Sequence, residues 1–510
     1  MQFRQQVAVR RVILPLRHPF LDRLVPPATQ RHVRSRLDYT LEALERRIVC
    51  TAGELDPSFG SGGLLFPNAP NGGTVLVSTG ADGHIVLGTV DTSRKVSQLQ
   101  RYTSDGQLDA SFGTGGVVTF EFTPDSGGWG GIEEFADLIV LPNGKVVAMG
   151  NHLAGNSTIQ TSLHAFNADG SADTSFGANS VVLLDNFGWP LMRAGADGRI
   201  FVFGAAPWTG TQDGMVVCLN GDGSLDTTFG DQGRVRLDFG AQEEIRHAAI
   251  GPNGEIVIVL SGEPQSPAFG FHVVRLTPAG QFDPTFGQGG RAIVTTSDGR
   301  AIPDGVRVMS DGRIVIVGAQ YGAALDAWQY AFVMRLNTDG SPDTTFGDGG
   351  TAERPLSSQL MEVQADGKII FASARQDAQG AQDTFLTRLT ADGRPDETFG
   401  EGGQRVHDFD DQYENVSSLR LTVSGDILIA GTMGGAVALA QFDAGELSEP
   451  LPSPAEPPPP APPAPQADKF NDVQPVRDVA DEAAPSLIRP WSDDLLHPDP
   501  DDEDLLAGLV

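Results

Sequence analysis

A block of nine residues recurs seven times in this chain and limits its fold more than any other feature. It first reads LDPSFGSGG at 55–63, and each later copy keeps the aspartate, a serine or threonine, and the pair Phe-Gly. The phenylalanine of the block falls at Phe59, Phe112, Phe176, Phe229, Phe286, Phe346 and Phe399, at intervals of 53–64 residues. Such self-similarity indicates that one supersecondary unit is repeated along the chain.

Two further segments accompany each block and predict four short strands per unit. A turn with Asp-Gly or Asn-Gly precedes one apolar run, as in ADGHIVLG at 81–88, and a second apolar run ends in another turn, as in VMRLNTDG at 333–340. These dipeptides indicate β-hairpins, because both central residues of such a turn need φ > 0. The runs are short and rich in Val, Ile and Leu, which favours strands over helices. Seven such units predict an all-β fold, a seven-bladed β-propeller of four-stranded blades.

The repeat begins and ends in mid-unit, which bears on how the ring closes. It starts with the block at 53–66 and stops after a third strand at 437–447. If the block leads the outermost strand of a blade, the first segment completes the sheet that the last segment begins. We therefore expect closure by exchange of strands between the two ends of the repeat.

The 510 residues divide into three segments, among which the formal net charge of −31 is spread unevenly. Residues 1–50 hold ten arginines and four acids, and a capping box with leucines at helical spacing predicts a short amphipathic helix at 36–49. Residues 51–447 form the predicted propeller and carry a net charge of −26. Residues 448–510 are rich in proline and acids, with a net charge of −11, and we expect a disordered tail there.

Composition excludes several classes of protein. The acidity argues against a nucleic-acid-binding protein, which needs a basic surface. No apolar run approaches the roughly 20 residues that span a bilayer as a helix. The two cysteines, Cys50 and Cys218, are too few for a disulfide scaffold, and we expect Cys218 to be a small buried side chain in an apolar strand. We expect a monomer.

The repeated residues resemble a known family. The pattern D-x-S/T-F-G-x-G-G, followed by D-G-K/R-I-x-V/I-x-G, is similar to the delta-60 repeat of bacterial propeller-like proteins and covers about 53–447. Copy three departs from it, with Ala178–Ser180 in place of the glycine pair. The segment LEALERRIVCTAGELD at 41–56 resembles the LEPR-x-LL element that precedes repeat domains in large bacterial surface proteins, common in planctomycetes. These resemblances imply a propeller and an extracellular or cell-surface location, with a cytoplasmic location as the alternative.

The residues that recur in every copy fit structural roles. A buried aromatic in each sheet would pack one blade against the next, so we expect the seven phenylalanines in the core. The aspartates of the N-x-D-G-x-x-D turns, as in Asn167–Asp173, Asn220–Asp226 and Asn337–Asp343, are expected to cap their own turns. The spacing is also reminiscent of a calcium loop. Calcium at the Asp-Gly turns therefore stays open as an alternative, and no other cofactor is expected.

No pattern of catalytic residues is evident. The nine histidines lack H-x-x-x-H spacing, and neither G-x-S-x-G nor a P-loop occurs. Aromatic residues instead concentrate in the variable loops, which the strand order places on the face opposite the Asp-Gly turns. These candidate ligand-binding residues are Trp129, Trp189, Trp208, Tyr321, Trp328, Tyr330 and Tyr413.

Aromatic residues on loops are typical of binding sites, and acids beside them suit hydroxyl groups or a cation. We therefore expect an interaction module that binds a protein or carbohydrate partner through this face, without catalytic or metal-ligating residues. Two alternatives remain. Each tryptophan packs onto its own sheet, or the protein is an enzyme, such as a lyase or hydrolase, with its site at the central channel.

Overall fold

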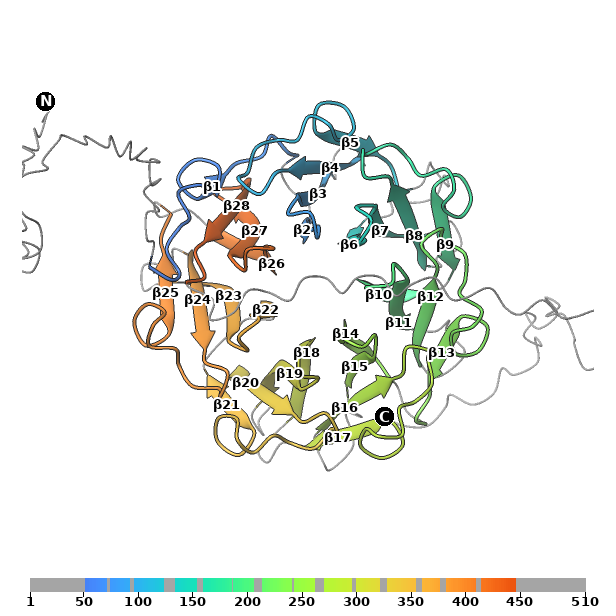
Figure 1. Ribbon diagram of the computed structural model, residues 1–510, viewed down its shortest axis with the longest axis vertical. Helices are drawn as coiled ribbons and strands as arrows, with labels where there is room; N and C mark the ends of the chain where they lie inside the picture. The colour runs from blue at the N-terminus through green and yellow to red at the C-terminus, as the bar shows by residue number, and fades with distance from the viewer. Residues whose placement is uncertain are drawn as a thin grey trace, which may run out of the picture. The chain divides into compact units, whose positions relative to one another are not determined.

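The computed structural model describes residues 51–445, except for 71–73, 92–95, 123–133, 154–158, 186, 206–212, 241–242, 262–269, 296–299, 322–327, 355–359, 377–381 and 410–413. The described residues belong to one compact unit and form 28 strands and no helix. The strands make seven four-stranded sheets arranged in a ring, as Figure 1 shows. The predicted seven-bladed β-propeller is therefore confirmed. The helix predicted at 36–49 and the tail predicted at 448–510 lie outside the described residues.

Each blade presents its first strand to the centre of the ring and its last strand to the outside (Figure 1). The innermost strands are β2 (Val75–Thr79), β6 (Glu134–Val140), β10 (Gly188–Ala194), β14 (Ile245–Ile250), β18 (Arg300–Val308), β22 (Leu360–Val363) and β26 (Glu414–Leu421). The second strands are β3 (Ile85–Asp91), β7 (Val146–Leu153), β11 (Ile200–Ala205), β15 (Ile256–Ser261), β19 (Ile314–Tyr321), β23 (Ile369–Gln376) and β27 (Ile427–Met433).

The outer half of each blade is built from the remaining strands. The third strands are β4 (Val96–Tyr102), β8 (Ile159–Phe166), β12 (Gly214–Leu219), β16 (Gly270–Leu276), β20 (Trp328–Leu336), β24 (Gln382–Leu389) and β28 (Ala436–Phe442). The outermost strands are β5 (Val117–Phe120), β9 (Val181–Asp185), β13 (Arg234–Leu237), β17 (Arg291–Thr295), β21 (Thr351–Arg354), β25 (Gln404–His407) and β1 (Leu64–Leu65). No helix of the described residues has the length and apolar character needed to cross a membrane.

The first hairpin follows from an Asp-Gly or Asn-Gly turn in six blades and from Ser424-Gly425 in the last blade. Between β2 and β3, Gly83 has a φ of +84°, which a residue with a Cβ adopts only at a cost. Asp82 Oδ1 accepts a hydrogen bond from the backbone N–H of His84 at 3.1 Å, so this aspartate closes its own turn. Because consecutive strands alternate in direction, the two turns of each blade share one face of the ring. The other ends of these strands, which the variable loops join, lie on the opposite face.

The ring closes by strand exchange, as the phase of the repeat predicts. The outermost strand of the last blade is β1, from the beginning of the repeat, and it pairs with β28 at Leu64↔Ala440. Further upstream, the N–H of Gly53 donates to the carbonyl of Asp443 at 2.6 Å. Segments from both ends of the repeat therefore share one sheet, and β28 is not left as an unpaired edge.

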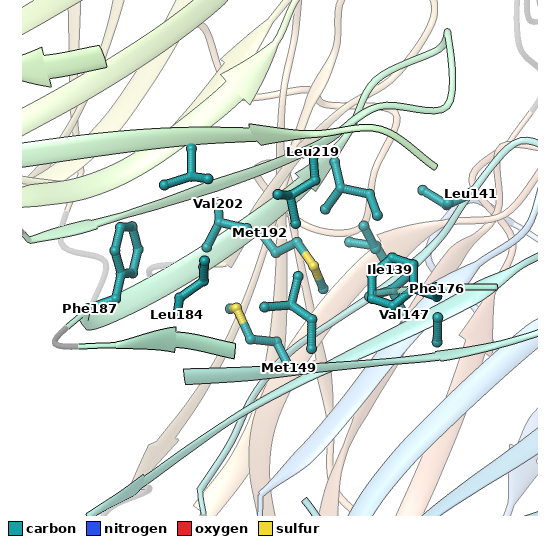
Figure 2. Close-up of a cluster of buried hydrophobic side chains, with 14 residues drawn as sticks. Ile139, Leu141, Val147, Met149, Phe176, Leu184, Phe187, Met192, Val202 and Leu219 are labelled. Atoms are coloured by element: carbon teal, nitrogen blue, oxygen red, sulfur yellow. The ribbon is translucent and has the colours of Figure 1, made fainter. Parts of the chain in front are cut away.

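Apolar cores lie between neighbouring blades. Figure 2 shows the cluster shared by the blades β6–β9 and β10–β13, where Met149 and Phe176 meet Met192 and Val202. All seven recurrent phenylalanines have no exposed surface, which confirms their predicted place in the core. Full burial of such a side chain contributes about 1.5–3 kcal/mol. Each blade therefore depends on its neighbours for much of its hydrophobic core.

A buried arginine links each of four blades to the next. Arg275, in β16, donates from Nε to Asp283 Oδ2 and from Nη2 to Thr285 Oγ1, both at 2.9 Å. Its Nη1 donates to the carbonyl oxygen of Thr338 on the following blade, and its guanidinium carbon lies 4.7 Å from the ring centroid of Phe286. The same set of contacts is made by Arg101, Arg335 and Arg388. The repeated aspartate is thus half of an ion pair as well as a turn cap.

Two blades make this link with a different cation. Where an alanine or Cys218 replaces the arginine, Lys145 Nζ donates to the carbonyl of Gly221 at 2.6 Å, and Arg199 Nη1 donates to that of Pro278 at 2.9 Å. The contact between blades is therefore kept, although its donor comes from near the first hairpin. Cys218 is fully buried, as expected, and burial raises the pKa of its thiol to about 12.

Copy three keeps its turn without the glycine pair. Asn179 and Ser180 take φ values of +55° and +74°, where five other copies have two glycines and copy four has Gln232, with a φ of +47°, before its glycine. Asparagine tolerates this left-handed region better than most residues. The N–H of Ala178 still donates to the carbonyl of Val181 at 2.8 Å, so the departure from the repeat does not interrupt the blade.

Candidate functional site

The innermost strands of all seven blades line a cavity of about 930 Å³ at the centre of the ring. One position of the repeat, five residues before the glycine of the first hairpin, contributes a lining residue in every blade. These residues are Ser78, Ile139, Arg193, Ala249, Arg307, Glu362 and Arg420. Because they occupy the same place in the repeat, they form one layer around the channel, which we call the arginine layer.

Charge in the arginine layer is unbalanced. Three guanidinium groups, those of Arg193, Arg307 and Arg420, meet two carboxylates, those of Glu362 in the same layer and Asp137 beside it. This surplus of one positive charge belongs to the arginine layer alone, because the whole lining of the cavity holds four arginines and four acids. Clefts with low-dielectric walls concentrate such a field and attract ions of opposite charge.

Arg193 is held by four neighbours. Its Nη1 lies 3.1 Å from Asp137 Oδ2 and donates to the carbonyl of Met192 at 2.7 Å. Its Nε donates to the carbonyl of Ala248 at 2.8 Å, and its Nη2 lies 3.0 Å from His247 Nε2. Each of its three nitrogens therefore has a partner within the protein, and these contacts occupy four of its five N–H groups.

Burial sets the protonation of this group. It lowers the pKa of Arg193 to about 10, against the opposing charge of Asp137, so the side chain stays charged at neutral pH. Burial also lowers the pKa of His247 well below its ordinary value, and the charge of Arg193 acts in the same direction. His247 is therefore neutral, and its Nδ1 faces the N–H of Val306 at 3.4 Å.

Arg307 and Glu362 form a two-pronged ion pair between neighbouring blades. Nε and Nη2 of Arg307 donate to the two oxygens of Glu362 at 2.9 and 2.8 Å, and Nη1 donates to the carbonyl of Val306 at 2.9 Å. Burial disfavours both charges, but their mutual attraction outweighs it. The pKa of Arg307 is therefore raised and the pKa of Glu362 is lowered. This pair leaves no nitrogen of Arg307 without a partner.

Arg420 is the arginine of this layer with the most donors to spare. Its Nη1 donates to the carbonyl of Leu419 at 2.8 Å and lies 3.8 Å from Glu362 Oε1, which Arg307 already holds. No described residue accepts a hydrogen bond from Nε or Nη2 of Arg420. We call this edge of the guanidinium the free edge. It is available to a ligand in the cavity that Arg420 lines.

A second charged layer belongs to the variable-loop end of the channel, because it stands at the start of β14 and at the bulge of β18. Arg246 Nη1 pairs with Glu244 Oε1 at 2.7 Å. Burial raises the pKa of Asp304 to about 6, although the charge of Arg246 opposes the shift. This layer is therefore close to neutral below pH 6 and gains one negative charge above it.

The predicted aromatic site lies partly outside the described residues. The residues outside them are Trp129, Trp208 and Tyr413. The residues whose backbone is described lie in three strands: Trp189 in β10, Tyr321 in β19, and Trp328 and Tyr330 in β20.

Strand register brings three of these aromatic positions together. In the hairpin β19–β20, Tyr321 pairs with Trp328, and Gln320 pairs with Tyr330. The three positions therefore share the variable-loop end of one blade, as predicted, but the prediction that they stand in loops is wrong, because the strands of this hairpin extend to include them. Trp189 lies at the same end but on the innermost strand of another blade.

The charged residues of the channel are not among those predicted from the sequence. Their signal is present, however, when the seven units are aligned on the glycine of the first hairpin. One position of the innermost strands then carries Arg193, Arg307, Glu362 and Arg420. Charged residues in a buried strand are rarely accommodated unless paired, so this position stands out. Asp137 and His247 stand two residues earlier in their own units.

One group of carboxylates has the spacing of a metal site. One oxygen each from Asp213, Asp238 and Glu243 lies within 4.8 Å of the others. Arg236 Nε donates to Asp213 Oδ2 at 2.5 Å, and its Nη2 lies 3.6 Å from Asp238 Oδ2. A cation of the protein thus already pairs with two of the three carboxylates, and we assign no metal to them.

The solved structures that are similar to this chain belong to proteins of different kinds. YCF48 bound to a D1 peptide has 14% identity and a TM-score of 0.39, over 77% of this chain and 99% of that one. Drosophila Plexin A in complex with Semaphorin 1b has 11% identity and a TM-score of 0.43, over 77% of this chain and 88% of that one. The sialidase of Trypanosoma rangeli in complex with the inhibitor DANA has 9% identity and a TM-score of 0.37, over 73% of this chain and 55% of that one. Likeness at this level does not indicate what this chain binds or whether it is an enzyme.

Among curated proteins, no sequence matches the chain. The family described as a domain of unknown function (DUF5122) β-propeller matches five segments, at 80–112, 195–229, 251–286, 310–346 and 364–399. Each segment starts at the first hairpin of a unit and ends at a recurrent phenylalanine. The match thus falls on the same repeat that predicts the fold. The chain is therefore similar to a family of repeat β-propeller domains.

Proposed function

We propose that the protein is a binding module whose central channel holds a ligand with an anionic group. The observation that carries the proposal is the free edge of Arg420, in a layer with one unbalanced positive charge. Hydrogen bonds to charged donors are the strong ones in proteins, and a guanidinium edge without a protein acceptor in a cavity favours an anion. The volume of about 930 Å³ is in the range of small-molecule sites.

Binding fits the arginine layer better than acid–base catalysis does. A general acid or base needs a titratable group with a free atom facing the substrate. His247 has Arg193 on one ring nitrogen and the N–H of Val306 near the other. Asp137 Oδ1 accepts from the N–H of Leu138 at 2.9 Å, and both oxygens of Glu362 are taken by Arg307. The groups of this layer are thus committed to holding one another.

Replacing Arg420 with glutamine should remove anion binding. We expect wild-type protein to bind at least one small organic anion from a panel of carboxylates and phosphate esters, but not the matching neutral amides and alcohols. Loss of a charge-assisted hydrogen bond of about 1.5–3 kcal/mol predicts affinity at least tenfold lower for Arg420→Gln, measured by isothermal titration calorimetry.

Arg394→Gln is the matched control, because Arg394 is 78% exposed beside Asp392 and its loss changes the net charge equally. We expect this variant to bind like the wild type. Equal affinities of wild type and Arg420→Gln, or no binding of any anion, would contradict the proposal.

The variable-loop face is a second candidate, favoured by the cross-strand register of Tyr321, Trp328 and Tyr330. We propose that this face binds a protein or carbohydrate partner of a monomeric protein at the cell surface or outside the cell. The location rests on the resemblance of 41–56 to the element found in bacterial surface proteins. Aromatic side chains at one end of a hairpin offer rigid contact area at low entropic cost.

Replacing Trp208 and Trp328 together by alanine tests this second candidate. Aromatic anchors often account for 2 kcal/mol or more of binding, so we expect retention on cell-wall glycans or cell extracts to fall at least tenfold. Phe66→Ala is the control, because Phe66 is an exposed aromatic residue beside the outermost strand β1. Unchanged retention of the double variant would contradict a binding role for this face.

The proposal includes no cofactor. In the turn at Asn337–Asp343, Asp339 Oδ1 accepts hydrogen bonds from Ser341 N at 2.9 Å and from Ser341 Oγ at 2.6 Å. These bonds close the turn without an ion, which supports a structural role for the Asp-Gly aspartates. We therefore propose that the turns do not need calcium.

A further inference from the structure

We infer that the anionic group of the ligand is a carboxylate, held between the free edge of Arg420 and the hydroxyl of Ser78. This inference rests on the proposed function of the channel and names the chemistry of its ligand. Three features of the arginine layer lead to it: the neighbours of Arg420, the net positive charge of the layer, and the geometry of the free donors of Arg420.

The first feature is the arrangement of strands around Arg420. Its strand, β26, stands between β22, which carries Glu362, and β2, which carries Ser78. Ser417 Oγ donates to the carbonyl of Val75 at 2.9 Å, which ties β26 to β2. Arg420 and Ser78 occupy the same position of the repeat in adjacent blades and both line the cavity. Glu362 therefore lies on one side of Arg420, and a hydroxyl lies on the other.

Ser78 has a donor that the protein does not use. Its side chain is 8% exposed, and no described residue exchanges a hydrogen bond with its hydroxyl. The neighbouring Thr79 differs, since its Oγ1 donates to the carbonyl of Leu421 at 3.3 Å. A hydroxyl that lines a cavity without a protein partner can donate to water or to a ligand there. Ser78 thus offers a second donor on the side of Arg420 that lies away from Glu362.

The second feature is charge. Three arginines and two carboxylates leave a surplus of one positive charge, and a carboxylate neutralises one. A phosphate monoester carries about 1.5 to 2 negative charges at pH 7. It would turn the layer negative, next to Glu362 and in a channel that Asp304 also lines. Repulsion of like charges in a cavity of low dielectric therefore favours the monoanion.

The third feature is the geometry of the donors. Nε and Nη2 of an arginine form a planar fork that matches the two oxygens of a carboxylate. A phosphate has a third oxygen to satisfy, and few N–H groups are left for it beyond this fork, because every nitrogen of Arg193 and Arg307 already makes a contact within the protein. Leu76, Leu360 and Met361 line the cavity as well, and they suit an apolar ligand body. The site is therefore fitted to an organic monocarboxylate.

Matched ligands separate this inference from the proposed function. Butyrate, benzoate and phenylacetate are titrated against wild-type protein by calorimetry, together with the phosphonates and amides that share their apolar bodies. We expect at least one carboxylate to bind at least tenfold more tightly than its phosphonate, with no binding of the amides. Stronger binding of the phosphonates would overturn the carboxylate inference and leave the proposed function standing. Absence of binding for all acids would overturn both.

Two variants test the residues. Arg420→Lys keeps the charge but removes the fork, so we expect the carboxylate to bind at least tenfold more weakly. Ser78→Ala should weaken the carboxylate three- to tenfold and leave thermal unfolding unchanged, because the hydroxyl has no protein partner. Arg394→Gln is the control and should bind like the wild type. Full affinity in Arg420→Lys would overturn the role of the fork, and full affinity in Ser78→Ala would overturn the role of the hydroxyl.

Discussion

Replacing Arg388 with alanine should lower the free energy of unfolding by about 3–5 kcal/mol, because it breaks a buried ion pair. The side chain is 2% exposed, and Nε lies 2.7 Å from Asp396 Oδ2. Nη1 donates to the carbonyl of Ala444 on the last blade, and the guanidinium carbon lies 4.5 Å from the ring centroid of Phe399. The variant loses this link between blades and leaves a buried carboxylate with Lys368, at 3.5 Å, as its remaining cation.

Arg394 provides the control for this prediction. It lies six residues away in the same blade, its side chain is 78% exposed, and it faces the exposed Asp392 at 3.4 Å. Arg394→Ala should change the free energy of unfolding by less than about 0.5 kcal/mol. Guanidinium unfolding followed by circular dichroism measures both. Equal midpoints for the two variants would show that the buried link does not stabilise the ring.

Replacing Phe59 with alanine should destabilise the protein by about 3–5 kcal/mol, through the cavity that it leaves. Phe59 has no exposed surface and belongs to the core shared by the last and first blades, with Val77, Leu87 and Leu439. This core exists because the beginning of the repeat joins the last blade. The prediction therefore tests the closure of the ring as well as the packing of one side chain.

Phe66 is the matched control for Phe59. It stands in the same segment, one residue after β1, but 54% of its surface is exposed. Phe66→Ala should change the free energy of unfolding by less than about 0.5 kcal/mol. If Phe59→Ala were as mild as Phe66→Ala in guanidinium unfolding, the segment would not close the ring as described.

The sequence predicts those parts of the fold that local chemistry determines. Asp-Gly turns require a positive φ, as at Gly83, and apolar runs between such turns give strands of known order. The repeat then predicts the number of blades, and its phase predicts that β1 joins β28. The recurrent phenylalanines are predictable as core residues, because each unit has the same apolar face and only a neighbouring unit can bury it.

The arginine layer is harder to predict, because its contacts join residues far apart in the chain. Arg193 meets His247 across 54 residues, and Arg307 meets Glu362 across 55, so the pairs become neighbours only when the ring is formed. Each of these arginines, taken alone, is an ordinary charged residue near the end of a strand. The cation that joins blades is equally hard to predict, since Lys145 and Arg199 replace an arginine from a different strand.

The claim that the channel holds an anion is tested most directly by diffraction from crystals soaked in bromide, whose anomalous scattering locates the bound ion. We predict a strong bromide peak in the channel, within hydrogen-bond distance of Nε or Nη2 of Arg420 and beside Ser78. The same soak of Arg420→Gln should lack this peak. Bromide bound only at the outer surface of the wild-type protein, with none in the channel, would contradict the account.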